Sequence, residues 1–165
     1  MHRSIALAIA LAMVAITVDV GAASAADYVT IRNEVTVEKS ADAVWKRVGS
    51  YCAIAEWLQV SCEYVSGDGG PGTVRALVNG ATLEPMVAWT AHSYTYWQTR
   101  GNMQAATLHG TLAVEPVAAN RSRLSYTLFY DQAAMPSDEV RKSERERLNK
   151  RFRAALETMK QLVEQ

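Results

Sequence analysis

The stretch from Ser61 to Asp131 is the feature that most limits how this chain can fold. It has no convincing helical period, only short runs in which apolar and polar residues alternate between turn signals. Alternation with a period of two is typical of antiparallel strands that bury one face. We therefore expect a meander whose clearest extended runs are Ser61–Val65, Leu83–Trp89, Tyr94–Thr99, Ala105–Val114 and Arg123–Asp131, with breaks at residues 101–102 and 118–120.

The Asn79-Gly80 pair is the clearest turn in this stretch. An Asn-Gly pair between extended segments favours a two-residue type I′ hairpin, because both central positions need a positive φ. In that register Arg75 lies opposite Glu84, and Leu77 lies opposite Thr82. We therefore predict a cross-strand ion pair between Arg75 and Glu84.

Helical segments are expected on both sides of the meander. Tyr28–Val37 reads as a first strand, and a helix capped by Ser40 and ended by Gly49 follows it. Ser50–Leu58 reads as a second short helix. After the meander, Pro136-Ser137 opens a long closing helix.

The closing helix is predicted from Asp138 to about Glu164. Its second half carries an apolar stripe made of Leu148, Phe152, Ala155, Met159 and Leu162. Residues 141–153 hold seven basic and two acidic side chains. This run is either a solvated helix face or a basic rim that attracts an anionic headgroup or ligand.

Residues 1–25 have the pattern of a secretory signal peptide. A basic start with Arg3 is followed by the apolar run Ile5–Val18 and by small residues up to Ala25. The alternative is a membrane anchor, but the apolar run is shorter than the roughly 20 residues that span a bilayer. Cleavage would leave residues 26–165 as one exported domain, periplasmic or secreted, with no stable membrane insertion.

Two cysteines, Cys52 and Cys62, fall in the exported part. In an oxidising compartment we predict a disulfide between them, which would contribute about 2 to 3 kcal/mol to stability. The alternative is two free buried thiols. We predict no metal site, because two cysteines with the distant His92 and His109 lack ligand spacing.

The charge balance argues against one class of partner. The chain has 17 basic and 17 acidic residues, whereas a nucleic-acid binder is expected to carry clustered excess positive charge. With 49% hydrophobic residues, the composition is that of a globular domain.

Four segments together resemble a known family. Val35–Trp45, Cys52–Trp57, Gly69–Arg75 and Gly110–Pro116 occur in the order found in the START-like, or SRPBCC, superfamily, and the second is similar to its polyketide cyclase/dehydrase-like branch. The resemblance implies an α+β helix-grip fold. In this fold a curved antiparallel sheet of about six to seven strands wraps around a long C-terminal helix, and two short helices follow the first strand.

The resemblance also implies a cavity between the sheet and the closing helix. Matching with the related abscisic-acid receptors points Arg75, Leu77, Thr82, Glu84, Tyr96, Gln98, Leu108, Gly110 and Tyr130 into it. The period of two adds Met86, Tyr94, Leu112, Tyr126 and Leu128, and the helix would contribute Phe152, Leu156 and Met159. The turn at residues 78–81 is shorter than the receptors' gating loop, so hormone-like gating is not carried over.

The opposite orientation of the hairpin is also open. Its other face is more apolar and would ordinarily be taken as core, being formed by Val74, Ala76, Val78, Ala81, Leu83, Pro85 and Val87. If Arg75 and Glu84 instead face inward, they must pair, because burying an unpaired charge is costly. Such groups usually orient the polar end of a ligand.

Other chemical patterns lack the context that they need. Gly67–Gly72 fits G-x-G-x-x-G but contains Pro71 and precedes a strand, so we interpret it as a loop beside the cavity mouth. His92 falls in a predicted turn, and His109 falls on the outer face of the sheet. A catalytic triad therefore has little support, and we predict no cofactor.

Three hypotheses for function remain. The first is an exported, monomeric binding protein for a hydrophobic small molecule or lipid. The second is a cyclase or dehydratase-like enzyme, with Glu84 as general base, Tyr96 or Tyr130 as proton donor, and Arg75 as stabiliser of an enolate. The third is a protein whose cavity is filled by side chains and which acts through its surface.

Overall fold

The computed structural model describes residues 25–165, and a seven-stranded antiparallel sheet organises them. The strands are β1 (Tyr28–Val37), β2 (Cys62–Ser66), β3 (Val74–Leu77), β4 (Thr82–Thr90), β5 (Ser93–Trp97), β6 (His109–Ala118) and β7 (Arg121–Asp131). Their order in the sheet is β1-β7-β6-β5-β4-β3-β2, so every pair except β1 and β7 is adjacent in sequence. The predicted signal peptide, residues 1–25, lies outside the described residues except for Ala25.

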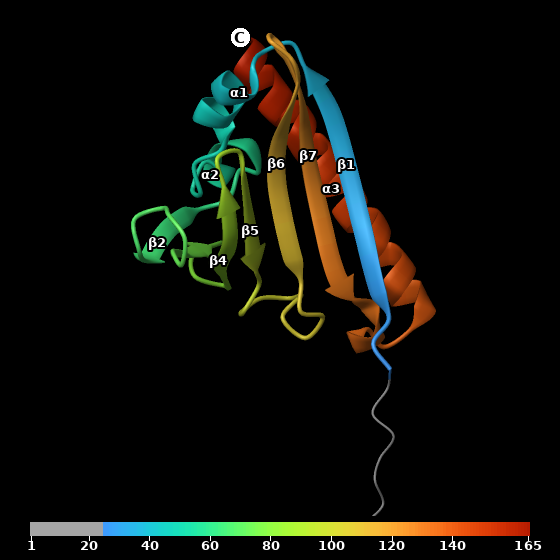
Figure 1. Cartoon of the computed structure of the whole chain (residues 1–165). Coiled ribbons are helices and arrows are strands. Elements are labelled where there is room, and N and C mark those ends of the chain that lie inside the picture. Colours follow the sequence, from blue (N-terminus) through green and yellow to red (C-terminus); the bar gives the residue numbers. More distant parts are fainter. Residues whose placement is uncertain (1–24) are drawn as a thin grey trace, which may run out of the picture.

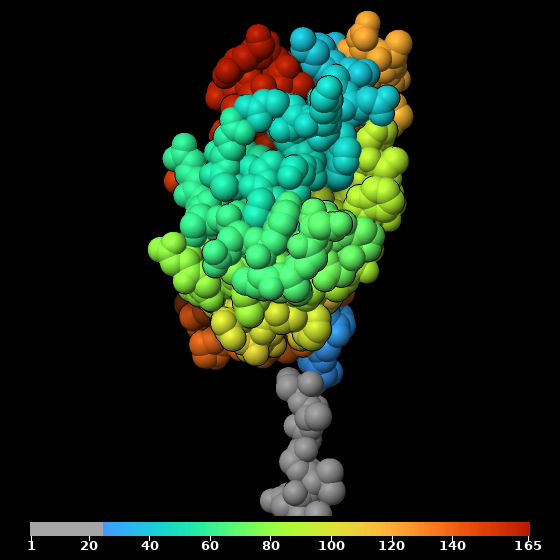
Figure 2. Space-filling model, turned by 90° about the vertical axis from the view of Figure 1, so that its left-hand side faces the viewer, coloured from blue at the N-terminus to red at the C-terminus, as the bar shows by residue number. Residues whose placement is uncertain are grey.

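Helices cover the sheet. They are α1 (Ala41–Val48), α2 (Ile54–Trp57), the 3-10 turn η1 (Gln132–Ala134) and α3 (Asp138–Glu164). Figure 1 shows α3 running along the long strands, and it contacts β1, β7, α1 and α2. Figure 2 shows that the segment from α1 to β3, coloured cyan to green, covers the centre of one side of the molecule. The predicted helix-grip α+β fold is confirmed.

The predicted ends of the main helices are confirmed. The Ser40 hydroxyl accepts a hydrogen bond from the Ala43 N–H at 3.3 Å, and Gly49 ends α1. The Ser137 hydroxyl accepts one from the Val140 N–H at 3.3 Å and starts α3. Each hydroxyl satisfies an N–H that the first turn of a helix leaves without a partner.

The predicted hairpin between β3 and β4 is confirmed in register. Arg75 pairs with Glu84, and Leu77 pairs with Thr82. Asn79 and Gly80 both have positive φ, as a type I′ turn requires. The Val78 carbonyl accepts from the Ala81 N–H at 3.1 Å and closes the turn.

The second predicted helix, Ser50–Leu58, was too long. Only Ile54–Trp57 is helical, and residues 51–53 form turns. The Tyr51 side chain is buried. Its backbone carbonyl accepts a hydrogen bond from Arg75 in β3, and its hydroxyl donates one to the Glu84 carbonyl in β4. These tertiary hydrogen bonds hold residues 51–53 in turns instead of the helix that the sequence predicted.

The strand predicted at Ala105–Val114 begins later, at His109. Residues 98–108 form a loop that the side chain of Gln98 holds, because its Oε1 accepts from the Met103 N–H at 2.8 Å. The Gln98 N–H donates to the Leu108 carbonyl at 2.8 Å and closes the same loop. Met103 and Ala106 are buried within it.

Candidate functional site

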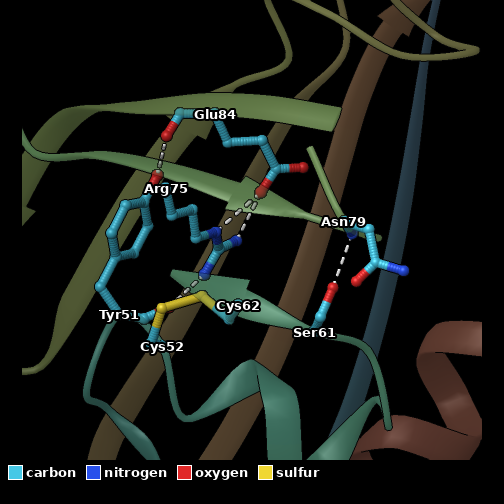
Figure 3. Close-up of a disulfide and its surroundings, with 7 residues drawn as sticks. All are labelled: Tyr51, Cys52, Ser61, Cys62, Arg75, Asn79 and Glu84. Carbon is cyan, nitrogen blue, oxygen red and sulfur yellow. Dashed lines mark hydrogen bonds and ion pairs between the residues drawn. A yellow bond between two sulfur atoms is a disulfide. The ribbon is translucent and has the colours of Figure 1, made fainter. Parts of the chain in front are cut away.

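An almost completely buried ion pair lies on the inner face of the hairpin. The Arg75 Nε donates to Glu84 Oε2 at 2.8 Å, and Nη1 donates to the Tyr51 carbonyl at 2.5 Å (Figure 3). Nη2 lies 2.7 Å from the same Oε2, close enough for an ion pair but without hydrogen-bond geometry. The side chains are 0% and 4% exposed, so the polar face of the hairpin points inward and the predicted ion pair is confirmed.

Three tyrosine rings surround the guanidinium. The Arg75 Cζ atom lies 4.1 Å from the ring centroid of Tyr51, 4.9 Å from that of Tyr96 and 5.6 Å from that of Tyr94. A cation over an aromatic face is attracted by the ring quadrupole, more strongly where water is excluded. The Tyr51 hydroxyl also donates to the Glu84 carbonyl at 2.9 Å, which ties the residue before the disulfide to β4.

The protonation of this cluster follows from its burial. Burial would lower the pKa of Arg75, but Tyr94 and the Glu84 carboxylate raise it, so the guanidinium stays charged. Burial raises the pKa of Tyr51 and Tyr94, and raises that of Tyr96 well above the usual range of a phenol. The three phenols are therefore neutral donors and acceptors at physiological pH.

A cavity of about 140 Å³ lies next to this cluster. Glu84 forms part of its wall, whereas Arg75 lies behind Glu84 and does not line it. Figure 3 shows one carboxylate oxygen of Glu84 turned to Arg75 and the other, Oε1, turned away. No hydrogen-bond partner of Oε1 occurs within residues 25–165, so this acceptor is available to a molecule in the cavity.

The structure divides the predicted cavity residues into two groups. Seven line the cavity: Leu77, Thr82, Glu84, Tyr96, Gln98, Leu108 and Phe152. The other ten are buried beside it in the packed core: Arg75, Met86, Tyr94, Gly110, Leu112, Tyr126, Leu128, Tyr130, Leu156 and Met159.

Aromatic packing explains why the second group does not reach the cavity. The Tyr126 ring stacks on Phe152 with centroids 4.3 Å apart, and Trp57 meets its edge at 5.9 Å. The Tyr126 hydroxyl donates to the Tyr96 hydroxyl at 3.0 Å. These side chains pack against one another in the core, and of the four only Phe152 and Tyr96 also line the cavity.

Gly110 makes room for one of these rings. A Cβ atom at this position would lie 2.3 Å from both Cζ and the hydroxyl oxygen of Tyr96. Strands β5 and β6 pair Tyr96 with Gly110 directly. The missing side chain of Gly110 therefore sets where the Tyr96 ring lies in the cavity wall.

Nine further wall residues were not predicted from the sequence: Ile54, Leu58, Val60, Val78, Asn102, Met103, Arg147, Leu148 and Arg151. Most come from loops or from the short helix α2, where no strand period marks an inward face. Leu148 belonged to the predicted apolar stripe of α3, and the two arginines belonged to its basic run. The apolar stripe and the basic run overlap at Arg147–Arg151, and this overlap could have indicated that this part of α3 lines the cavity.

The predicted disulfide between Cys52 and Cys62 is present, with a Cα–Cα distance of 5.5 Å. It closes the loop that carries Ile54, Leu58 and Val60, three wall residues of the cavity. Ser61 then fastens this loop to the hairpin turn, since its hydroxyl accepts from the Asn79 N–H at 2.7 Å (Figure 3). One wall of the cavity is thus held by a covalent bond and a hydrogen bond.

The glycine-rich loop and the two histidines make contacts within the fold. Gly67–Gly72 forms a loop, as expected, and none of its residues lines the cavity; the Gly69 N–H donates to the Thr73 hydroxyl at 2.9 Å. His92 lies in the turn before β5 and bonds Asp42 at 2.6 Å. His109 stacks on Trp97 with centroids 6.1 Å apart.

An antiparallel sheet gripping a long C-terminal helix, with a small cavity between them, defines the helix-grip class. The family model described as polyketide cyclase/dehydrase and lipid transport matches residues 28–164, which is nearly all of the described chain. The chain belongs to this family.

Solved structures of low sequence identity share the fold. The Zhui aromatase/cyclase from a Streptomyces species has a TM-score of 0.69 at 18% identity, covering 84% of this chain and 94% of that one. Truncated norcoclaurine synthase from Thalictrum flavum has a TM-score of 0.63 at 20% identity, covering 86% and 96%. A Nitrosospira multiformis protein has a TM-score of 0.65 at 22% identity, covering 79% and 92%.

Among proteins of curated function, none matches the chain. No helix within residues 25–165 is long and apolar enough to cross a membrane.

Proposed function

We propose that the protein is exported and binds one small hydrophobic molecule in the cavity between the sheet and α3. The observation that carries this proposal is the cavity itself, which has apolar side chains on several sides and one available carboxylate oxygen, that of Glu84. Ligand sites are typically apolar with a few placed polar groups that fix orientation. The family description includes lipid transport, which agrees with this class of ligand.

Two features support export. Residues 1–25 have the basic, apolar and small-residue pattern of a signal peptide. The disulfide between Cys52 and Cys62 is of the kind that persists in oxidising compartments.

A cyclase-like activity is the second candidate, favoured by the position of Glu84 in the cavity wall. The other groups of that hypothesis are poorly suited to it. Arg75 and Tyr130 do not line the cavity, and the raised pKa of Tyr96, caused first by burial, makes it a weak proton donor. The geometry therefore favours binding over catalysis.

Native mass spectrometry of the protein recovered from its own host tests the proposal. We expect a one-to-one complex with a small molecule that can be extracted and identified. A Thr82→Trp variant, which fills the cavity from its wall, should lose that molecule, whereas a Thr30→Trp variant on the exposed side of β1 should keep it. A complex that survives Thr82→Trp, or a wild-type protein free of any small molecule, would contradict binding in the cavity.

A further inference from the structure

We infer that the ligand of this cavity is a single-ring carboxylic acid that carries a hydroxyl or amino group. This inference rests on the proposed function, because it assigns a chemical class to the molecule that the cavity binds. Three independent observations lead to it: the volume of the cavity, the polar group in its wall and the charge on the side formed by α3.

The volume limits the ligand to about one ring. The cavity measures about 140 Å³. An engineered apolar cavity of roughly 150 Å³ holds a benzene molecule. Phe152 forms part of the wall, and its ring is held by stacking on Tyr126 with centroids 4.3 Å apart.

The carboxylate in the wall selects a hydrogen-bond donor. Glu84 Oε2 is occupied by Arg75, and Oε1 is turned away from it (Figure 3). A carboxylate oxygen accepts but cannot donate, so the ligand group that meets it must carry an O–H or N–H. A purely hydrocarbon ligand would leave this buried acceptor without a partner, which is unfavourable.

The side of the cavity formed by α3 selects an anion. Arg147 and Arg151 both line the cavity from this helix. Arg147 is paired with Glu144, one turn earlier. Arg151 forms no ion pair within residues 25–165, so its positive charge is available to a ligand. A carboxylate on the ligand would complement this arginine.

Titration calorimetry with para-hydroxybenzoate and three relatives tests the inference. We expect one-to-one binding of para-hydroxybenzoate, and binding of benzoate about ten- to a hundredfold weaker, because benzoate has no donor for Glu84. The methyl ester should bind about two- to fivefold more weakly, because it lacks the charge that faces Arg151. Hydroxynaphthoate, with a second ring, should not bind.

Variants on the surface of α3 complete the experiment without disturbing the core. Arg151→Gln should reduce the affinity for the acid to that for the ester and should remove the salt dependence of binding. Arg153→Gln, also exposed on α3 but outside the cavity wall, should bind like wild type.

The outcomes separate the inference from the proposed function. Equal affinity for benzoate and para-hydroxybenzoate, or tighter binding of hydroxynaphthoate or a fatty acid that Thr82→Trp abolishes, would overturn the assigned class and leave the cavity as a binding site. Failure of para-hydroxybenzoate to bind would overturn the assigned class, and it would overturn both only if the protein from its own host also carries no small molecule.

Discussion

At the scale of single residues, Arg75 and Glu84 are the pair on which the interior depends. A charge that is removed from water without a partner costs several kcal/mol, and here each ion is the other's counter-charge. The tyrosine rings and the Tyr51 carbonyl also interact with the Arg75 guanidinium, in addition to Glu84. The pair holds β3, β4 and the segment before the disulfide together.

Glu84→Ala is therefore predicted to destabilise the fold by about 3 to 5 kcal/mol, because it leaves Arg75 buried without a counter-ion. The double variant Arg75→Met/Glu84→Leu should recover most of this loss, since similar apolar side chains remove both charges. Urea unfolding monitored by circular dichroism measures both effects.

The chain offers a matched control for this prediction. Arg123 and Glu115 are also directly opposite across two strands and 2.9 Å apart, but both side chains are nearly half exposed. Glu115→Ala should cost only about 0 to 1 kcal/mol. Equal losses for Glu84→Ala and Glu115→Ala would show that burial does not give the inner pair its importance.

Gly110 gives a second prediction at this scale. Gly110→Ala places a Cβ atom against the Tyr96 ring, whose Cζ lies at 2.3 Å, and should cost about 1 to 3 kcal/mol through overpacking. Gly70→Ala, where the nearest atom is the exposed Asp68 carboxylate at 3.4 Å, is the control and should be nearly neutral. A Gly110→Ala protein as stable as Gly70→Ala would mean that the Tyr96 ring is not held in place.

At the scale of elements, the disulfide holds the loop that carries the wall of the cavity. The Cys52→Ser/Cys62→Ser variant should lose about 2 to 3 kcal/mol of stability, the amount expected for closing a short loop. Hydrogen exchange should speed up at Ile54 and Leu58 but not at Leu124 in β7. Unchanged protection of the loop would show that hydrogen bonds alone fix it.

The elements also show what the sequence could predict. The Asn79-Gly80 turn set the register, because a two-residue turn allows one pairing, and that pairing placed Arg75 opposite Glu84. The inward orientation of this pair came from the family resemblance, since the hydrophobic pattern alone favoured the other face. Capping residues likewise located α1 and α3 correctly.

Loop positions could not be predicted in the same way. Ile54 and Met103 reach the cavity because tertiary bonds fix their loops: the disulfide, the Tyr51 contacts and the Gln98 side chain. None of these bonds leaves a period in the sequence. The extent to which Tyr126 and Phe152 fill the interior was also hidden, because an alternating pattern marks a face but not its packing.

At the scale of the whole molecule, the buried tyrosines make the fold sensitive to alkali. Burial raises the pKa of Tyr51, Tyr94, Tyr96 and Tyr126 in the folded state. Above the unfolded value near 10, the unfolded chain loses these protons first, so stability falls as pH rises toward the folded pKa values. The loss is about 1.4 kcal/mol per pH unit for each tyrosine.

Urea unfolding between about pH 8 and pH 11 measures this slope. We expect a nearly constant midpoint up to about pH 9.5 and a steep decline above it, with tyrosinate absorbance rising together with unfolding. Tyr126→Phe should reduce the slope of this decline by about 1.4 kcal/mol per pH unit, which is the contribution of one tyrosine. A slope that does not change in this variant would contradict the burial of its hydroxyl.

A crystal structure of the protein soaked with para-iodophenol tests whether the space beside Glu84 is a site for one small molecule. The iodine gives an anomalous signal that locates the ring without reference to the rest of the density. We expect one site between Leu108 and Phe152, with the phenol hydroxyl donating to Glu84 Oε1. Iodine found only on the outer surface, with the cavity vacant at saturating probe, would contradict it.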